Sequence, residues 1–235
     1  MTNRLRTDGT TGRVTFVTGT DTGVGKTVLT GLMLIYLRRR GVHALAMKPF
    51  CTGDRHDARF LAALQQYELS VEELNPVYFP EPLAPFAAAF RRREAIDIAF
   101  AVACVRAAQK KCDWLIIEGV GGALVPLTSQ IKVVDVITEL DCEVVVVAPN
   151  RLGTINHTLL TLEALSRRGI RPVKVVLMDQ KKPDLSSRSN PRILKELIAP
   201  VPVFRLPFLG PKANFPSHLE RYFPKAKKIL AQILR

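Results

Sequence analysis

VTFVTGTDTGVGKT, which spans Val14 to Thr27, sets the expectation for the whole chain. An apolar run typical of a buried strand leads into a glycine-bearing turn, and a helical pattern begins near Lys26. The amides of such a turn and the positive end of the following helix suit a polyphosphate. Lys26 would neutralise β- and γ-phosphate oxygens, and the Thr27 hydroxyl would complete a Mg²⁺ shell. We therefore predict a phosphate loop at this turn.

The spacing of this loop is unusual. Five residues separate Gly19 from Gly25, whereas the common P-loop has four between its first glycine and Gly-Lys-Ser/Thr. The alternative is an ordinary strand-to-helix turn that contains glycines. The strand–loop–helix context around Gly-Lys-Thr favours the phosphate loop.

The chain has 235 residues, of which 47% are hydrophobic, so it can bury a large core. We assign residues 1–13 to a flexible N-terminal extension and residues 14–235 to one domain. No apolar run approaches the ~20 residues of a membrane span, and residues 1–13 lack the apolar region of a signal peptide. The four cysteines are scattered without metal-ligand spacing. These features predict a cytoplasmic protein that does not bind membranes.

The formal charge of +13 has two interpretations, a nucleic-acid partner or attraction of small anionic substrates. The basic residues are spread along the chain, and the single Trp and four Tyr are not interleaved with them. This distribution argues against a nucleic-acid partner.

Strand and helix patterns alternate throughout, which predicts an α/β fold with one doubly wound, mostly parallel sheet and helices on both faces. The proline-rich residues 75–86 are interpreted as an ordered loop. A helix over 94–111 is expected to direct Ile96, Phe100, Val102, Ala103 and Ala107 toward the core. The other expected strands are 42–47, 113–118, 142–148, 172–178 and 201–206; the other expected helices are 58–66, 133–140, 191–198 and 219–234.

Three charged residues stand where ligands bind in such sheets. Lys48 precedes Pro49 at the carboxyl end of a strand, and Glu118 ends a buried apolar strand in the manner of a Walker-B acid. Asp57 opens a helix, where it would either favour the helix terminus or bind Mg²⁺ through water. The alternatives are a solvated lysine, a helix-terminal acid and a loop glutamate.

Two backbone segments complete the expected crevice. Gly119 to Gly122 follow Glu118 and would let the backbone approach a nucleotide closely. Thr154 is expected to cap a helix whose free amides could hold a carboxylate.

Together these stretches resemble the dethiobiotin synthetase family over roughly residues 14 to 210. The resemblance is carried by residues 17–27, Lys48-Pro49 with Thr52-Gly53, Asp57, Asn75-Pro76 with Glu81-Pro82, residues 118–122 and residues 152–157. It implies that CO₂ carboxylates 7,8-diaminononanoate (diaminopelargonate) to a carbamate, that ATP converts the carbamate to a mixed anhydride, and that the second amine displaces phosphate. It also implies Mg²⁺ and a homodimer with the substrate at its interface.

The resemblance also implies roles for individual positions. Lys26 and Lys48 match the two catalytic lysines, and Thr27, Asp57 and Glu118 match the Mg²⁺ positions. The implied nucleotide-binding residues are Thr22, Gly23, Val24, Gly25, Lys26, Thr27, Val28, Asp57, Glu118, Gly119, Val120, Gly121, Met178, Asp179 and Pro207. The implied substrate-binding residues are Thr22, Lys48, Thr52, Gly121, Gly153, Thr154, Ile155 and Asn156, the last four acting from the partner subunit.

The chain departs from the family at two places. Met178-Asp179 stands where the family usually has Asn-Asp, and that asparagine reads the adenine edge; a thioether cannot make two directional hydrogen bonds. We therefore expect nucleoside triphosphates other than ATP to be used as well. Ala84-Pro85-Phe86 replaces the usual Ser-Pro-His, which would alter the substrate pocket.

The main alternative is a partitioning-type or MinD-like regulatory ATPase that binds membrane or DNA. Such proteins carry a signature lysine near the start of the loop, where this chain has Asp21. A cobyrinate-type amidotransferase is the third interpretation, but no glutaminase pattern follows. The sequence therefore favours a dethiobiotin synthetase-like enzyme over both alternatives.

Overall fold

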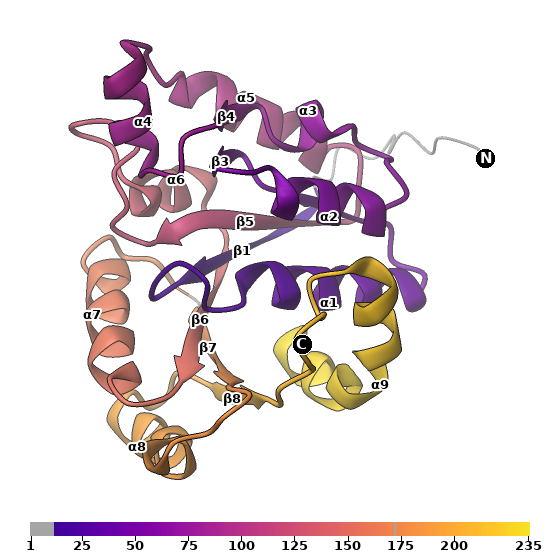
Figure 1. Ribbon diagram of the computed structural model, residues 1–235, viewed down its shortest axis with the longest axis vertical. Coiled ribbons are helices and arrows are strands. Elements are labelled where there is room, and N and C mark those ends of the chain that lie inside the picture. The colour runs from indigo at the N-terminus through magenta and orange to yellow at the C-terminus, as the bar shows by residue number, and fades with distance from the viewer. Residues whose placement is uncertain (1–11, 172) are drawn as a thin grey trace.

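A six-stranded sheet forms the centre of the computed structural model, which describes residues 12–171 and 173–235 (Figure 1). Its strand order is β2-β5-β1-β6-β7-β8, and every neighbouring pair is parallel. The strands are β1 (Arg13–Gly19), β2 (Ala44–Met47), β5 (Trp114–Gly122), β6 (Glu143–Asn150), β7 (Val173–Asp179) and β8 (Val203–Leu206). The predicted α/β class with a parallel sheet is confirmed.

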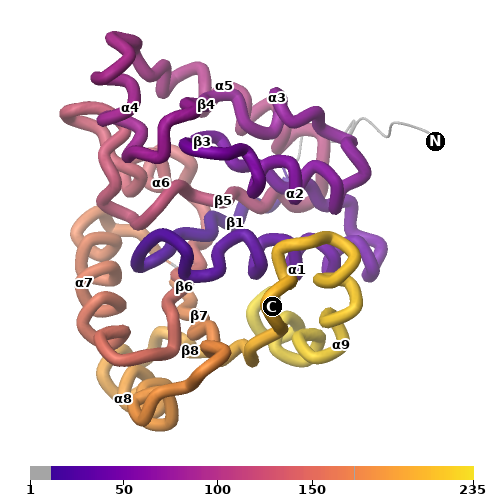
Figure 2. The backbone as a smooth tube through the Cα atoms, viewed as in Figure 1, coloured from indigo at the N-terminus to yellow at the C-terminus, as the bar shows by residue number. Residues whose placement is uncertain are grey.

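Helices flank this sheet on both faces. They are α1 (Lys26–Arg39), α2 (His56–Leu64), α3 (Val71–Leu74), α4 (Pro85–Arg92), α5 (Ile98–Gln109), α6 (Val133–Leu140), α7 (Thr154–Ser166), the 3₁₀ turn η1 (Leu185–Arg188), α8 (Asn190–Leu197) and α9 (Pro216–Ile233). In the tube view α9 lies along α1 (Figure 2). No helix in the described ranges is long and apolar enough to cross a membrane.

The central strands are continuous apolar runs because helices cover them on both sides. Leu115 to Ile117 in β5 and Val144 to Val147 in β6 are buried. β1 lies between these two strands, with Val17 opposite Glu118 and Gly19 opposite both Gly122 and Val147. The chain order reverses at β1, and in open α/β sheets ligands bind at such a point, outside the carboxyl ends of the strands.

The proline-rich segment is more structured than the sequence indicated. Instead of a loop, residues 75–86 contain β4 (Val77–Phe79), which pairs in parallel with β3 (Phe50–Thr52) as a separate two-stranded sheet. The same segment also includes the start of α4, where Pro85 stands in the first turn. Proline fits there because the amide that it lacks would have no partner within the helix.

The expected helix over 94–111 was wrong at its start and in its buried face. Arg93 adopts a left-handed conformation that ends α4, and Asp97 caps α5 by accepting a 2.8 Å bond from the Phe100 amide. Ile96 and Val102 pack half-buried against the core as expected, but Phe100 is 52% exposed, and Ala103 and Ala107 are also exposed. The residues of α5 that are buried instead are Ala101, Val105, Ala108 and Gln109.

Most other boundaries differ by at most three residues, as helix and strand ends commonly do. The strand expected to end at Glu118 continues to Gly122, so that Glu118 lies within β5. The division into an extension (1–13) and one domain (14–235) stays a prediction. Residues 1–11 lie outside the described residues, as does residue 172, and Arg13 already belongs to β1.

Candidate functional site

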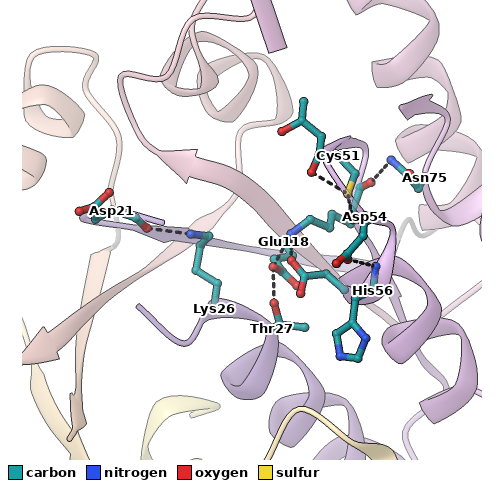
Figure 3. Close-up of polar contacts among 11 residues, drawn as sticks. Asp21, Lys26, Thr27, Cys51, Asp54, His56, Asn75 and Glu118 are labelled. Carbon is teal, nitrogen blue, oxygen red and sulfur yellow. Dashed lines mark hydrogen bonds and ion pairs between the residues drawn. The ribbon is translucent and has the colours of Figure 1, made fainter. Parts of the chain in front are cut away.

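Four predicted site residues from four different segments meet beside the carboxyl end of β5. The Lys48 Nζ donates to Glu118 Oε1 at 2.6 Å and to Asp57 Oδ2 at 2.7 Å. The Thr27 hydroxyl, in the first turn of α1, donates to the same Glu118 Oε1 at 2.8 Å (Figure 3). We call Thr27, Lys48, Asp57 and Glu118 the carboxylate cluster.

The carboxylate cluster holds its lysine charged although the residue is only 4% exposed. Burial by itself would lower the pKa of Lys48, but the negative charges of Glu118 and Asp57 and their hydrogen bonds raise it above its ordinary value. The ammonium is therefore permanently protonated at neutral pH.

The two carboxylates respond differently to the same lysine. Burial raises the pKa of Glu118, and the repulsion of Asp57 adds to that effect, so that the pKa stays above its ordinary value despite Lys48. Asp57 is 40% exposed in its side chain, and although burial raises its pKa, the attraction of Lys48 outweighs this and lowers it. Asp57 is thus the better ionised partner of the pair.

Lys26, at the start of α1, forms no ion pair with a carboxylate of the described residues. Its Nζ donates to the backbone carbonyl of Asp21 at 2.9 Å (Figure 3). Burial lowers the pKa of Lys26 to about 8, although Glu118 opposes this shift. Phosphate oxygens arriving at the loop would supply the negative charge that this ammonium lacks.

The phosphate loop is shaped by its glycines. Gly25 precedes α1 with φ of 101°, a left-handed conformation in which a Cβ would also lie 2.9 Å from Met178 Cε. No side chain caps this end of α1. The first-turn amides are consequently free of side-chain partners, as an anion site at a helix N-terminus requires.

The residues present fit a magnesium ion. Thr27, Asp57 and Glu118 offer only oxygen atoms as ligands, and the buried Glu118 Oε2 has no hydrogen-bond partner among the residues that the structure describes. The described residues contain no group of three or more His, Cys, Asp and Glu side chains that could hold a metal. Two carboxylates and a hydroxyl suit Mg²⁺, which usually keeps waters and phosphate oxygens as further ligands.

The predicted base-side residues line one small cleft beside the phosphate loop. It has a volume of about 170 Å³, and Gly23, Gly25, Met178, Asp179 and Pro207 contribute to its wall. The polar side chains in its lining already have partners within the protein. Asp179 accepts from Arg205 at 2.8 and 2.9 Å and from Asn150 at 2.8 Å, and Gln180 donates to the carbonyl of Met178 at 2.8 Å.

The structure also places the expected substrate-side residues. Gly121 has φ of 58°, and a Cβ there would lie 3.8 Å from a Thr22 methyl group, so these two positions are neighbours. Thr52 ends β3, four residues after Lys48. Gly153 to Asn156 form the start of α7, and no contact joins them to the carboxylate cluster within this chain's described residues.

The expected capping role of Thr154 was wrong. Gly153 is the N-cap, with φ of 91°, and no side chain caps α7. Thr154 is the first helical residue, and its hydroxyl is buried without a hydrogen-bond partner. The first amides of α7 donate to no side-chain cap among the described residues, so they remain available to a carboxylate as predicted.

Comparison with known proteins identifies the family. A family model described as an AAA domain matches residues 13–210. The chain is 38% identical over 187 residues to the ATP-dependent dethiobiotin synthetase BioD of Endomicrobium trichonymphae, covering 77% of this chain and 87% of that protein. It is 39% identical over 199 residues to the protein of the same name from Haloferax mediterranei, covering 83% of each. The chain belongs to the dethiobiotin synthetase family.

Solved structures similar to this dethiobiotin synthetase family member support the fold alone. The ParA family ATPase of Chlorobium tepidum superposes with a TM-score of 0.56 at 17% identity, covering 92% of each chain. MinD of Pyrococcus horikoshii, complexed with Mg-ADP, gives 0.57 at 14% identity, covering 94% of this chain and 93% of that one.

Sequence reasoning missed several residues that hold the site of this dethiobiotin synthetase family member in place. Asn75 donates to the carbonyl of Lys48 at 2.9 Å, and Arg55 donates to both oxygens of Asn75, at 2.9 and 2.8 Å. The Asn-Pro pair was a visible signal for Asn75. Arg205 and Asn150, which hold Asp179, gave no local signal because they lie far from it in sequence.

Proposed function

We propose that this chain closes the ureido ring of dethiobiotin in an ATP- and Mg²⁺-dependent reaction. One amine of diaminopelargonate adds to CO₂ and loses a proton to give a carbamate. A carbamate oxygen then attacks the γ-phosphorus and ADP leaves, which gives a carbamic-phosphoric anhydride. The second amine attacks the anhydride carbon, phosphate leaves and the ring closes. The observation that carries the proposal is the carboxylate cluster beside the phosphate loop, in a chain of this family.

The two lysines divide the negative charge between them. Lys26, held on the Asp21 carbonyl, would bind the β- and γ-phosphate oxygens as they enter the loop. Lys48, at the carboxyl end of β2 on the opposite side, would stabilise the carbamate and its developing anhydride. Catalysis of phosphoryl transfer depends mainly on such positioning and charge stabilisation.

Thr27, Asp57 and Glu118 would hold Mg²⁺, with the free Oε2 of Glu118 as its buried ligand. When bound, the ion would neutralise phosphate oxygens. The backbone of residues 22–28 would hold the phosphates, and that of Gly119 to Gly121 would face the nucleotide.

The base would enter the cleft lined by Met178, Asp179 and Pro207. Because Asp179 and Gln180 are already hydrogen-bonded within the protein, the cleft offers packing rather than polar readout by side chains. We therefore propose weak discrimination between ATP and other nucleoside triphosphates.

The substrate would lie between two copies of the chain in a homodimer. Thr22, Thr52 and Gly121 of one copy would face its reacting end, and the uncapped start of α7 of the partner, residues 153–156, would bind its carboxylate. The 81% exposure of Leu152 beside that helix start is consistent with a subunit contact. Free cysteines at all four positions are consistent with a cytoplasmic enzyme.

The test is incubation of the purified chain with diaminopelargonate, bicarbonate and MgATP, followed by mass detection of the product. We expect dethiobiotin, with one ADP and one phosphate released for each ring closed. The control omits bicarbonate from CO₂-depleted buffer. ATP hydrolysis that only DNA or lipid stimulates, without dethiobiotin, would instead support the regulatory ATPase.

A further inference from the structure

The ammonium of Lys48 lies where a cation of the metal site is expected. It bonds to one oxygen of each carboxylate that we propose as a Mg²⁺ ligand, Glu118 Oε1 and Asp57 Oδ2. The Thr27 hydroxyl, the third proposed ligand, is bonded to the same Glu118 oxygen. All three ligands are therefore joined to one another around the ammonium. Glu118 Oε2, which has no hydrogen-bond partner among the described residues, belongs to the same carboxylate that Lys48 holds through Oε1.

The ammonium and a divalent cation cannot share this place. Both are positive, the surroundings are buried, and like charges at such range repel strongly where water screens them poorly. The two carboxylates carry two negative charges, which Lys48 half neutralises and Mg²⁺ would neutralise fully. Because a cation on the same two carboxylates would repel the ammonium, we expect Lys48 to leave these oxygens when the cation binds.

The surroundings restrict this movement to the side chain. The Lys48 amide donates to the Leu74 carbonyl at 3.0 Å, and the Lys48 carbonyl accepts from Asn75 at 2.9 Å. Asn75 is in turn held by Arg55. The backbone at the end of β2 is thus fixed on both sides, while the four-carbon stem of the lysine can rotate.

We infer that Lys48 is the displaceable counter-ion of the metal site. Without a divalent cation it neutralises Glu118 and Asp57, and when the cation binds, its ammonium is released into the crevice. This inference deepens the proposed function and rests on its assignment of the three metal ligands. It adds that metal binding delivers Lys48 to the anionic substrate, so that cation and substrate bind synergistically.

The first test measures Mn²⁺ binding to the nucleotide-free full chain through the electron paramagnetic resonance signal of free Mn²⁺. Mn²⁺ serves as the probe because it shares the oxygen ligands and octahedral preference of Mg²⁺. Lys48→Met should bind Mn²⁺ at least roughly tenfold more tightly than the wild type. Lys26→Met is the matched control, since it removes an equally buried charge that bonds to a carbonyl; it should change the affinity less than about threefold.

Equal tightening of Mn²⁺ binding in both variants, or no tightening in Lys48→Met, would overturn the inference.

A second measurement on the wild type covers the case in which Lys48→Met does not fold. Acetylation of lysines by acetic anhydride is followed by mass spectrometry, without nucleotide, in the presence of chelator or saturating Mg²⁺. Lys48 should react at least about threefold faster with Mg²⁺, while exposed Lys228 on α9 should not change. Unchanged or slower acetylation of Lys48 would contradict its release.

Neither readout needs substrate or turnover. A chain that binds Mn²⁺ as predicted but forms no dethiobiotin would overturn the proposed reaction and leave the counter-ion inference standing. A chain that forms dethiobiotin but shows no release of Lys48 would overturn the counter-ion inference and leave the proposed reaction standing.

Discussion

The phosphate loop and the carboxylate cluster each contain one buried lysine, and the two lysines behave in opposite ways. Lys26 is 6% exposed and Lys48 is 4% exposed. Lys26 bonds to a carbonyl, and burial lowers its pKa to about 8; for Lys48, burial acts in the same direction but two carboxylates overcome it. The difference shows that burial lowers the pKa of a lysine here unless carboxylate partners overcome it.

The two regions are consequently prepared for different ligands. The phosphate loop carries a buried ammonium that forms no ion pair with a carboxylate of the described residues, which favours an incoming anion. The carboxylate cluster contains one ammonium and two carboxylates, so it favours an incoming cation. A magnesium–nucleotide complex would satisfy both regions at once.

The largest expected effect concerns stability. Lys48→Met leaves two carboxylates without their buried counter-ion, and breaking a buried pair in this way costs about 3–5 kcal/mol of unfolding free energy. Lys26→Met removes a desolvated charge that pairs with no carboxylate of the described residues, so it should raise the unfolding free energy at pH 7, by up to about 3 kcal/mol. Urea unfolding at pH 7 without nucleotide or metal measures the change in unfolding free energy for each variant. Equal losses would erase the distinction between the two lysines.

The pH dependence of stability should separate the two lysines next. The pKa of Lys26 is lowered from 10.5 to about 8 on folding, so the unfolded chain binds the extra proton between these values and stability rises with pH across that window. Relative to Lys26→Met, the wild type should gain about 3 kcal/mol from pH 8 to 10.5. Urea unfolding of both proteins in this range tests the sign. A flat difference would contradict a burial-driven shift.

Nucleotide affinity should depend on one lysine more than on the other. Lys26→Ala removes a charged hydrogen-bond donor to phosphate, worth about 1.5–3 kcal/mol, or roughly 10- to 100-fold in the dissociation constant. Lys48→Ala should change that constant by less than about threefold in the presence of saturating Mg²⁺, because Lys48 serves the carbamate side. Isothermal titration with a non-hydrolysable ATP analogue compares them. The reverse order would exchange their assigned roles.

The smallest expected effect is on nucleotide selectivity. It arises at the cleft lined by Met178, Asp179 and Pro207, to which neither lysine contributes. Wild-type kcat/KM values for ATP, CTP and GTP should agree within about tenfold, since the cleft offers no unpaired polar side chain for readout. Met178→Asn should raise the preference for ATP by about fivefold, the worth of one hydrogen bond. Steady-state rates with the three nucleotides decide, and an exclusive preference for ATP in the wild type would refute the role given to Met178.

The parallel sheet and the position of the crevice could be predicted because each depends on local patterns. Apolar runs separated by helices imply parallel strands, and the carboxyl ends of parallel strands meet at one edge. Lys48 and Glu118 each end such a run, and the structure does bring them together with Thr27 and Asp57.

The remaining features depended on contacts that no local pattern records. Whether Lys48 faced solvent or the carboxylates was set by residues 9 and 70 positions away. The buried face of α5 was mispredicted because its sequence, IAFAVACVRAAQ, is apolar almost all round and has no polar stripe to orient it. β4 has only three residues, too short for a period to be visible.

The contrast between the two lysines is tested most directly by the product that Lys48→Ala forms. The variant and the wild type are incubated with diaminopelargonate, bicarbonate and MgATP, and dethiobiotin is quantified by mass beside the nucleotide dissociation constant. We predict that Lys48→Ala binds the nucleotide within about threefold of the wild type yet loses at least about 10²- to 10³-fold in ring closure. Full ring closure by Lys48→Ala would contradict the role of Lys48 and, with it, the division of labour between the phosphate loop and the carboxylate cluster.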